Sequence, residues 1–382
     1  MKARDLHALW RRFTRHAPLR RPRDYGRLLR APAAEVPALR LIGWLGHENI
    51  GDDAMFEALR DHLVAGAVVL PERDLSLLTA LAFARRGALP TVLGGGTLVH
   101  LWGYLQPLEA AVRAGRPTAT FGVGVADLDY WRAFPRPGRG HGDRWARALS
   151  RAAYIGVRGP RSLAWMHAHG LDRAEVLGDL ALSHPAATRA VSRPREPGLV
   201  GLNLGAQDPV LGGQDRAFDA VVAVARELAR RGHRLLHVPL HRVDAALGAR
   251  LAAAVGPALE VAPRRADVGA VVADIARCEV FVGQRLHATV LAAASGVPPL
   301  SLAYQPKCLD FLESIDAADL AVPTESVDGG GLLERVEGLL AAATAVRERV
   351  VAAVAAHRRR QERRGAELVA WARDPAAGWP AL

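Results

Sequence analysis

Arg285, His287 and Lys307 have the types and positions expected of an anion-binding site that can also move a proton. Arg285 and His287 follow a short apolar run, residues 280–282, where a helix of small residues is predicted to begin. The first N–H groups of a helix attract anions, an arginine presents a planar fork to carboxylate or phosphate, and a histidine exchanges a proton near neutrality. A second predicted strand, residues 300–304, ends shortly before Lys307. Because neighbouring parallel strands end at one edge of a sheet, we expect these side chains to share a site there.

The first half of the chain offers further candidates at the ends of predicted strands. A Gly/Asn/Asp turn follows residues 38–45, a glycine triplet follows residues 90–93, and an arginine follows residues 153–157. Glycines leave backbone N–H groups open to a ligand, and asparagine or aspartate can begin the helix after a turn. The predicted substrate-binding residues are Asn49, Gly51, Asp52, Gly94, Gly95, Gly96 and Arg158, together with His241 and Tyr304 near strand ends in the second half.

Simpler structural roles stay open for several of these residues. Asp52 could do no more than cap a helix, Arg158 could form a salt bridge between domains, and His241 could lie on a surface turn. Arg285 alone could cap a helix, and His287 alone could be an interior histidine with its hydrogen bonds satisfied. Their occurrence together in one strand-to-helix turn favours a functional site.

Strands and helices alternate along most of the chain, which predicts an α/β fold of two Rossmann-like lobes. The first lobe is assigned to residues 36–190 and the second to residues 198–328, and a Pro/Arg/Ala-rich segment, residues 185–197, is a predicted hinge. Both sheets should be mostly parallel and face a central cleft. Residues 329–382 are predicted to form a helical tail that packs back on the body, and the long loop at 127–143 to cover the cleft or bind an acceptor.

Composition limits the possible functions. Ten basic residues face two acidic ones in the first thirty, so eight of the eleven excess positive charges lie in these thirty residues, which make up most of a basic leader, residues 1–35. That leader could be a solvated tail, pack on the body through a short helix at residues 6–13, or rest on anionic lipid. The rest of the chain is nearly balanced in charge and has no zinc-ligand spacing or nucleic-acid-binding motif, so a nucleic-acid partner is not expected. Two cysteines favour a reducing cytoplasm, and no metal cluster is predicted.

Several motifs, taken in order, resemble those of the polysaccharide pyruvyl transferase family between about residues 41 and 312. They are Asn49-Ile50-Gly51-Asp52, Gly94-Gly95-Gly96-Thr97-Leu98, Val157-Arg158-Gly159-Pro160-Arg161-Ser162, Gly178-Asp179, Arg285-Leu286-His287-Ala288 and Tyr304-Gln305-Pro306-Lys307. Leu180 after Gly178-Asp179, where proline is more usual, and Gln284, where an apolar residue is common, depart from the family's pattern.

This resemblance implies a fold like that of the GT-B glycosyltransferases and transfer of the pyruvyl group of phosphoenolpyruvate to sugar hydroxyls of a cell-surface polysaccharide or its precursor. The first lobe would then be the acceptor side and the second the donor side, with no cofactor besides the donor substrate. Arg285 and His287 match the family's arginine and catalytic histidine, Arg158 its other donor-binding arginine, and Lys307 the lysine after the second strand. The base for the acceptor hydroxyl is left open between Asp52 and Asp127.

Two other functions remain as alternatives. A nucleotide-sugar-dependent glycosyltransferase of the same architecture would need a carboxylate for the ribose, and Glu313 is the nearby candidate. A non-enzymatic protein that binds a membrane or polymer would depend on the basic leader. We expect a cytoplasmic protein, with possible peripheral contact between residues 1–35 and the anionic inner face of the membrane, and self-association stays open. The acceptor is expected to be a glycan or a lipid-linked sugar.

Overall fold

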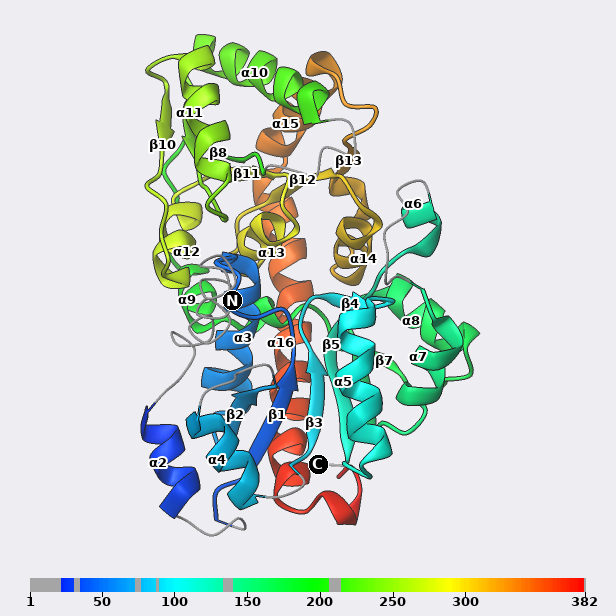
Figure 1. Ribbon diagram of the computed structural model, residues 1–382. Helices are drawn as coiled ribbons and strands as arrows, with labels where there is room; N and C mark the ends of the chain where they lie inside the picture. The colour runs from blue at the N-terminus through cyan, green and yellow to red at the C-terminus, as the bar shows by residue number, and fades with distance from the viewer. Residues whose placement is uncertain are drawn as a thin grey trace, which may run out of the picture.

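The computed structural model describes residues 22–30, 35–72, 77–86, 89–132, 140–205 and 214–380, which form two α/β lobes one above the other (Figure 1). The predicted helix at residues 6–13 lies outside the described residues. Each lobe is a parallel sheet with helices packed against it, and the prediction of two Rossmann-like lobes is confirmed. Within the described residues, no helix combines the length and apolar character needed to cross a bilayer.

The N-terminal lobe is built on a sheet in the order β2-β1-β3-β5-β6-β7, and the short strand β4 pairs with β5 beside it. Its strands are β1 (Ala38–Ile42), β2 (Val68–Pro71), β3 (Thr91–Gly94), β4 (Thr97–Val99), β5 (Thr118–Val125), β6 (Tyr154–Val157) and β7 (Glu175–Val176). Its helices are α2 (Pro22–Arg30), α3 (Ile50–Ala58), α4 (Leu77–Arg86), α5 (Trp102–Arg113), α6 (Leu128–Arg132), α7 (Gly142–Leu149) and α8 (Pro160–Ala168), and α3 continues as a π-helical turn, η2 (Leu59–Leu63).

The C-terminal lobe carries a second sheet in the order β10-β9-β8-β11-β12-β13, also parallel throughout. Its strands are β8 (Leu199–Asn203), β9 (Arg234–His237), β10 (Leu259–Val261), β11 (Val280–Gly283), β12 (Pro299–Ala303) and β13 (Ala321–Pro323). Its helices are α10 (Gln214–Arg230), α11 (Asp244–Val255), α12 (Val268–Ala276), α13 (Leu286–Ala294), α14 (Pro306–Ser314) and α15 (Gly329–Ala341), with a 3-10 turn, η5 (Ala318–Leu320), before β13.

Each strand order reverses direction once, and ligands of such sheets bind at the carboxyl ends of the strands on either side of the reversal. In the N-terminal lobe this point lies between β1 and β3, and in the C-terminal lobe it lies between β8 and β11. The predicted Gly/Asn/Asp turn follows β1, the glycine triplet begins at the last residue of β3, and Arg285 follows β11. The fold therefore places the predicted residues at the two positions where a ligand is expected.

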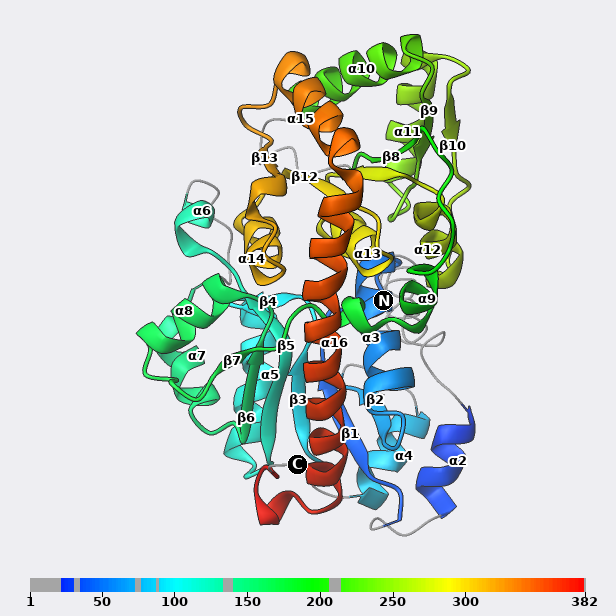
Figure 2. The ribbon, with the colours of Figure 1, turned by 180° about the vertical axis from the view of Figure 1, so that it is seen from behind.

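Helix α16 (Ala343–Arg373) runs from the C-terminal lobe down the N-terminal lobe and ties the two together (Figure 2). His357 Nε2 lies 2.6 Å from the Ser314 carbonyl in α14, and its Nδ1 lies 3.3 Å from the Leu177 carbonyl in the first lobe. Arg358 likewise donates to the carbonyls of Leu182 and Ala294, at 2.7 and 2.6 Å. A short 3-10 turn, η6 (Pro375–Ala377), follows the helix.

The structure refines several sequence-based boundaries. Residues 22–30 of the predicted leader form α2, whose Tyr25 and Leu28 are buried against the body. The predicted hinge begins with a helix, α9 (Pro185–Ala190), which follows the 3-10 turn η3 (Leu180–Ser183). The predicted loop at 127–143 contains α6 and the first residues of α7, and its residues 133–139 are not described. The first strand ends at Ile42, three residues earlier than predicted.

Gly365 of α16 marks a close contact between this helix and the N-terminal lobe. A Cβ atom on Gly365 would lie 2.4 Å from the backbone oxygen of Leu63. Alanine normally stabilises a helix interior relative to glycine, but here the methyl group would push α16 away from η2. We predict that Gly365→Ala lowers the free energy of unfolding by about 1–3 kcal/mol, measured by urea denaturation.

Gly338 in α15 is the matched control, because nothing lies within 4 Å of a Cβ placed there. Gly338→Ala should raise the free energy of unfolding by about 0.5–1 kcal/mol. Equal stabilisation by both substitutions would show that α16 does not pack on η2 as described.

Candidate active site

A cavity of about 300 Å³ lies between the two lobes and is lined by residues from both. Its cationic and titratable lining residues are Arg158 and Asp52 from the first lobe and Arg285, His287 and Lys307 from the second. Asn49, Gly96 and Tyr304 also line it, so eight of the twelve predicted site residues share one cavity. The remaining lining residues are Trp44, Thr97, Leu98, Leu101 and Leu286.

Arg285 is fixed at the end of β11 by residues of the C-terminal lobe. Its backbone N–H donates to Asn203 Oδ1, the last residue of β8, at 3.1 Å. Its guanidinium forms a two-pronged ion pair with Asp244, at 2.7 and 2.5 Å, and the Asp244 side chain is completely buried. The Arg285 side chain is 20% exposed, so the pair fixes its direction while the side chain still lines the cavity.

His287 lies in the first turn of α13, where the helix leaves N–H groups without helical acceptors. Its imidazole is pressed against α3 of the opposite lobe. A Cβ atom on Gly51 would lie 2.0 Å from both Cγ and Nδ1 of His287, so only glycine fits at that position. On the other side, His287 Nε2 lies 3.7 Å from Asp179 Oδ2, a carboxylate with no exposed surface. The imidazole is therefore held between the lobes.

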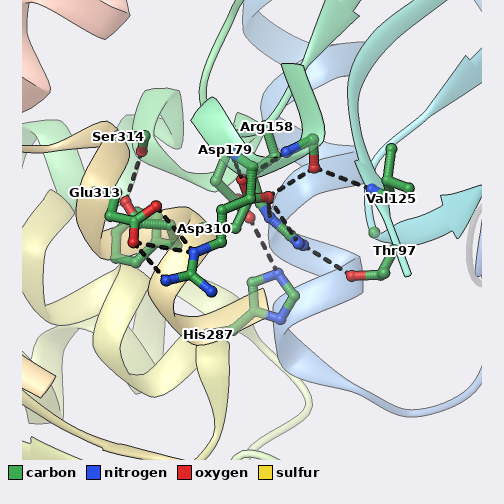
Figure 3. A network of polar contacts seen from close by, with 12 residues as sticks. Thr97, Val125, Arg158, Asp179, His287, Asp310, Glu313 and Ser314 are labelled. Atoms are coloured by element: carbon green, nitrogen blue, oxygen red, sulfur yellow. Dashed lines mark hydrogen bonds and ion pairs between the residues drawn. The ribbon is translucent and has the colours of Figure 1, made fainter. Parts of the chain in front are cut away.

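Arg158 is fully buried at the end of β6, and its guanidinium spans the lobe interface (Figure 3). Its Nε and Nη2 each lie 3.3 Å from Asp310 Oδ2 in α14, and its Nη1 donates to Thr97 Oγ1 at 3.0 Å. The interdomain salt bridge considered for Arg158 thus exists, yet the same side chain also lines the cavity. A Cβ on Gly124 would lie 2.6 Å from Arg158 Nη2, so a glycine in β5 leaves room for the guanidinium.

Asp310 of the C-terminal lobe also caps the N-terminus of helix α8 in the N-terminal lobe. Its Oδ1 accepts hydrogen bonds from the backbone N–H groups of Arg161 and Ser162, at 3.0 and 3.1 Å, and its Oδ2 accepts one from the Ser162 hydroxyl at 2.8 Å. One carboxylate of the C-terminal lobe therefore pairs with Arg158 and caps a helix of the N-terminal lobe.

Burial shifts the two titratable groups of the cavity in opposite directions. Burial lowers the pKa of His287 to about 4; the positive charges of Lys307, Arg158 and Arg285 add to this shift, and Asp179 opposes it. Burial raises the pKa of Asp52 to about 8, with Asp53 adding to the shift and Lys307 opposing it. At neutral pH Asp52 therefore holds a proton and His287 does not.

A second cavity, of about 340 Å³, adjoins the first and shares Lys307 with it. His100, Asp127, Asp129, Arg161 and Trp165 line it from the N-terminal lobe, and Pro306 and Asp310 from α14. The His100 ring packs edge-on against Trp165, with 4.9 Å between ring centroids, and its Nε2 has no hydrogen-bond partner within the described structure. The cavity thus combines an aromatic ring with several polar side chains.

Four predicted residues do not line the main cavity. Gly51 supports it indirectly through its contact with His287. Gly94 and Gly95 instead line a much smaller apolar cavity between α3 and the N-terminal sheet. His241 pairs through its backbone with Asn49 across the lobes, and its N–H donates to Asp244 at 3.0 Å. His241 therefore contacts two residues of the site without lining the cavity itself.

The carboxylates that hold the cations were missed as site residues. Asp179, Asp244 and Asp310 are each fully or almost fully buried and each contact one of the predicted residues. Asp244 is separated from Arg285 by 41 positions and Asp310 from Arg158 by 152. The clearest signal for Asp179 was its place in the Gly-Asp pair after β7. For Asp244 and Asp310 no local pattern marked a partner.

The solved structures similar to this chain include proteins bound to UDP or UDP-GlcNAc. Staphylococcus aureus MnaA with UDP has a TM-score of 0.59 at 11% identity, over 91% of this chain and 99% of that one. UDP-GlcNAc 2-epimerase from Neisseria meningitidis bound to UDP-GlcNAc has a TM-score of 0.55 at 9% identity, over 82% and 94%. A variant of Os79 from O. sativa in complex with UDP has a TM-score of 0.53 at 14% identity, over 88% and 100%. The curated proteins gave no match.

These neighbours and the two facing parallel sheets define a protein of the GT-B class of architecture, as the sequence predicted. Within that class, the sequence model of one family, polysaccharide pyruvyl transferase, matches residues 49–306. The chain belongs to the polysaccharide pyruvyl transferase family and is a transferase. The matched segment begins at Asn49 and ends at Pro306, so it includes Arg158, Arg285 and His287 and stops one residue before Lys307.

Removal of Asp310 tests how the lobe interface holds Arg158. Asp310→Ala should lower the free energy of unfolding by about 3–5 kcal/mol, because it leaves a buried guanidinium without its carboxylate. Denaturation by urea provides the measurement. The double variant Arg158→Met/Asp310→Leu should lose less than Asp310→Ala alone, since it buries no unpaired charge.

Glu313 of the same helix provides the control. Its pair with Arg161 is partly exposed, at 27% and 45% of the side chains, and Glu313→Ala should cost less than about 1 kcal/mol. If the Asp310 and Glu313 variants were equally stable, the buried pair would not hold the interface.

Proposed function

We propose that this protein transfers the pyruvyl group of phosphoenolpyruvate to two hydroxyl groups of a sugar, forming a pyruvate ketal and releasing phosphate. The observation that carries this proposal is one cavity in which Arg158 of the first lobe and Arg285 and Lys307 of the second surround His287. Phosphoenolpyruvate carries a carboxylate and a phosphate on one small molecule. Three cations and a helix N-terminus suit two such groups, while His287 stands beside them as a proton donor.

The three cations differ in whether a carboxylate of the protein already pairs with them. Arg158 and Arg285 are each already paired with a buried aspartate, which fixes their geometry. Within the described residues no carboxylate lies within salt-bridge distance of Lys307, whose ammonium lies 4.9 Å from the centre of the Tyr304 ring. We therefore assign Lys307 to charge neutralisation of the donor and the two arginines to its orientation.

The reaction begins with the donor anion in the cavity. Its negative charge raises the pKa of His287, so the imidazole takes up a proton and gives it to the methylene carbon C3 of phosphoenolpyruvate. An acceptor hydroxyl oxygen forms a bond to the electrophilic C2 and loses its proton, and the bond from C2 to the phosphate oxygen breaks as phosphate leaves. The second hydroxyl oxygen then bonds to C2, loses its proton and closes the ketal.

The second cavity provides space for the acceptor sugar. It shares Lys307 with the donor cavity, so a molecule there lies beside the reacting carbon. Trp165 offers an apolar ring for a sugar face, and Asp127 and Asp129 offer carboxylates for hydroxyl groups. Asp127 is then the base candidate on the acceptor side. Asp52, with its pKa of about 8, becomes a competent base only when it has lost its proton.

The second candidate function, a nucleotide-sugar glycosyltransferase, is suggested by neighbours whose structures contain UDP or UDP-GlcNAc. Such an enzyme would need a carboxylate to bind the ribose, and Glu313 was the candidate. Glu313 is engaged by the Arg161 guanidinium at 2.7 to 3.0 Å and does not line the main cavity. This geometry favours phosphoenolpyruvate. A cytoplasmic location and an acceptor that is a glycan or a lipid-linked sugar remain predictions from the sequence.

Donor binding and turnover separate these candidates. Phosphoenolpyruvate should raise the thermal unfolding temperature, and UDP-GlcNAc should not.

Variants of the site separate donor binding from turnover. His287→Gln should keep the rise in unfolding temperature caused by phosphoenolpyruvate but lower phosphate release with a sugar acceptor by about 100-fold or more. Arg285→Ala should lose the rise in unfolding temperature itself. Trp165→Ala should raise the acceptor KM and leave the donor-induced shift unchanged. Stabilisation by UDP-GlcNAc alone would refute the assignment of the donor.

Donor binding should also be coupled to proton uptake. His287, with a pKa of about 4, is neutral in the empty site at pH 7.5, and the bound anion raises this pKa. Binding therefore takes up a proton, and donor affinity falls as the pH rises through the higher pKa of the complex. Calorimetric titrations in two buffers with different ionisation heats measure this uptake. The His287→Gln variant corrects for protons taken up by the donor itself, and equal uptake in both proteins would contradict the role of His287.

A further inference from the structure

The outward face of α4 is built from apolar side chains. Of the large hydrophobic residues that are exposed in the described structure, three lie on this helix: Leu77, Leu78 and Leu81, exposed by 74%, 42% and 46%. Ala80 and Ala84 are exposed beside them, and the one hydroxyl of the helix, Thr79, is completely buried. A surface helix normally presents polar residues to water, so this apolar face indicates a surface that binds another protein or a membrane.

Basic residues surround these leucines. Helix α2 lies alongside α4 in both views (Figures 1 and 2), and the Tyr25 and Thr79 hydroxyl oxygens lie 2.8 Å apart between the two helices. Three arginines are exposed on α2, namely Arg23, Arg27 and Arg30. On α4, Arg85 is exposed as well. Asp24 is the single acidic residue of the two helices.

We propose that the surface formed by α2 and α4, with Leu77, Leu78 and Leu81 at its centre, binds an anionic lipid bilayer. Leucines that enter the acyl boundary and arginines that contact lipid phosphates are the two requirements of an interfacial helix. The sequence before α2 adds charge of the same sign, with seven basic residues and one acidic residue in positions 1–21. A second copy of the chain on this face would bring like charges together, which favours lipid over self-association.

This inference does not depend on the proposed reaction. The two helices pack against β1 and β2 through a cluster that includes Leu28, Val68, Leu70 and Ala82. They lie on the N-terminal lobe, away from the residues that line the donor cavity. The surface can therefore be changed without altering that cavity.

Co-sedimentation of the full chain with vesicles tests the proposal. The protein should bind phosphatidylcholine vesicles that contain phosphatidylglycerol and bind pure phosphatidylcholine weakly. Leu77→Gln/Leu78→Gln/Leu81→Gln should lower the partition coefficient at least about 10-fold. Arg23→Gln/Arg27→Gln/Arg30→Gln should lower it by roughly 5-fold per arginine on the anionic vesicles. Arg226→Gln/Arg230→Gln/Arg231→Gln, which removes three exposed charges from the other lobe, should leave binding unchanged.

A fluorescence measurement shows which face enters the lipid and does not depend on multiple substitutions. Both native cysteines are buried, so a Cys introduced by Leu78→Cys can be labelled selectively with an environment-sensitive dye. Its emission should shift to the blue with anionic vesicles, whereas a label at Val243→Cys, 37% exposed in the other lobe, should not respond.

No binding to anionic vesicles, or unchanged binding by the leucine variant, would overturn the proposal. A lipid-free dimer that the leucine variant converts to monomers would assign the surface to self-association instead. An unchanged thermal shift with phosphoenolpyruvate in the leucine variant would show that the fold is intact and keep this result separate from the proposed reaction.

Discussion

Buried carboxylates hold the two arginines of the cavity in place, and the geometry of the site depends on these ion pairs. Arg158 and Arg285 line one cavity and would repel one another, and each is paired with an aspartate whose side chain is at most 4% exposed. Breaking such a pair leaves a buried charge without a partner, which costs several kcal/mol. The arginines are therefore oriented before any donor arrives, and little ordering is needed when it binds.

The ion pairs also explain why the site belongs to both lobes. Asp310 joins α14 to Arg158 and to the start of α8, and Gly51 of α3 is in close contact with His287 of α13. Helix α16 crosses the same boundary through His357 and its two carbonyl contacts. A change in the angle between the lobes would alter the surroundings of Arg158 and His287 together. The geometry of the site and the relative position of the lobes are thus coupled through the same contacts.

Much of the fold and the centre of the site could be predicted from the sequence because their signals are local. The strand-to-helix turn before α13 predicted the positions of Arg285 and His287, and the βα alternation predicted both sheets. The arginine partners Asp244 and Asp310 could not be predicted, because tertiary packing brings each to its cation over a long separation in sequence. The Gly-Asp pair marked Asp179 in the sequence, but its contact with His287 also depends on tertiary packing. The same limit applies to α4, because the exposure of its leucines depends on which face packs against β1 and β2.

A crystal structure of the protein with phosphoenolpyruvate tests the central claim most directly. The account predicts donor density in the cavity between the lobes, with carboxylate and phosphate oxygens within hydrogen-bond distance of Arg285 and Lys307 and the methylene carbon beside His287. Density for the donor at any other place, with this cavity left to solvent, would contradict it.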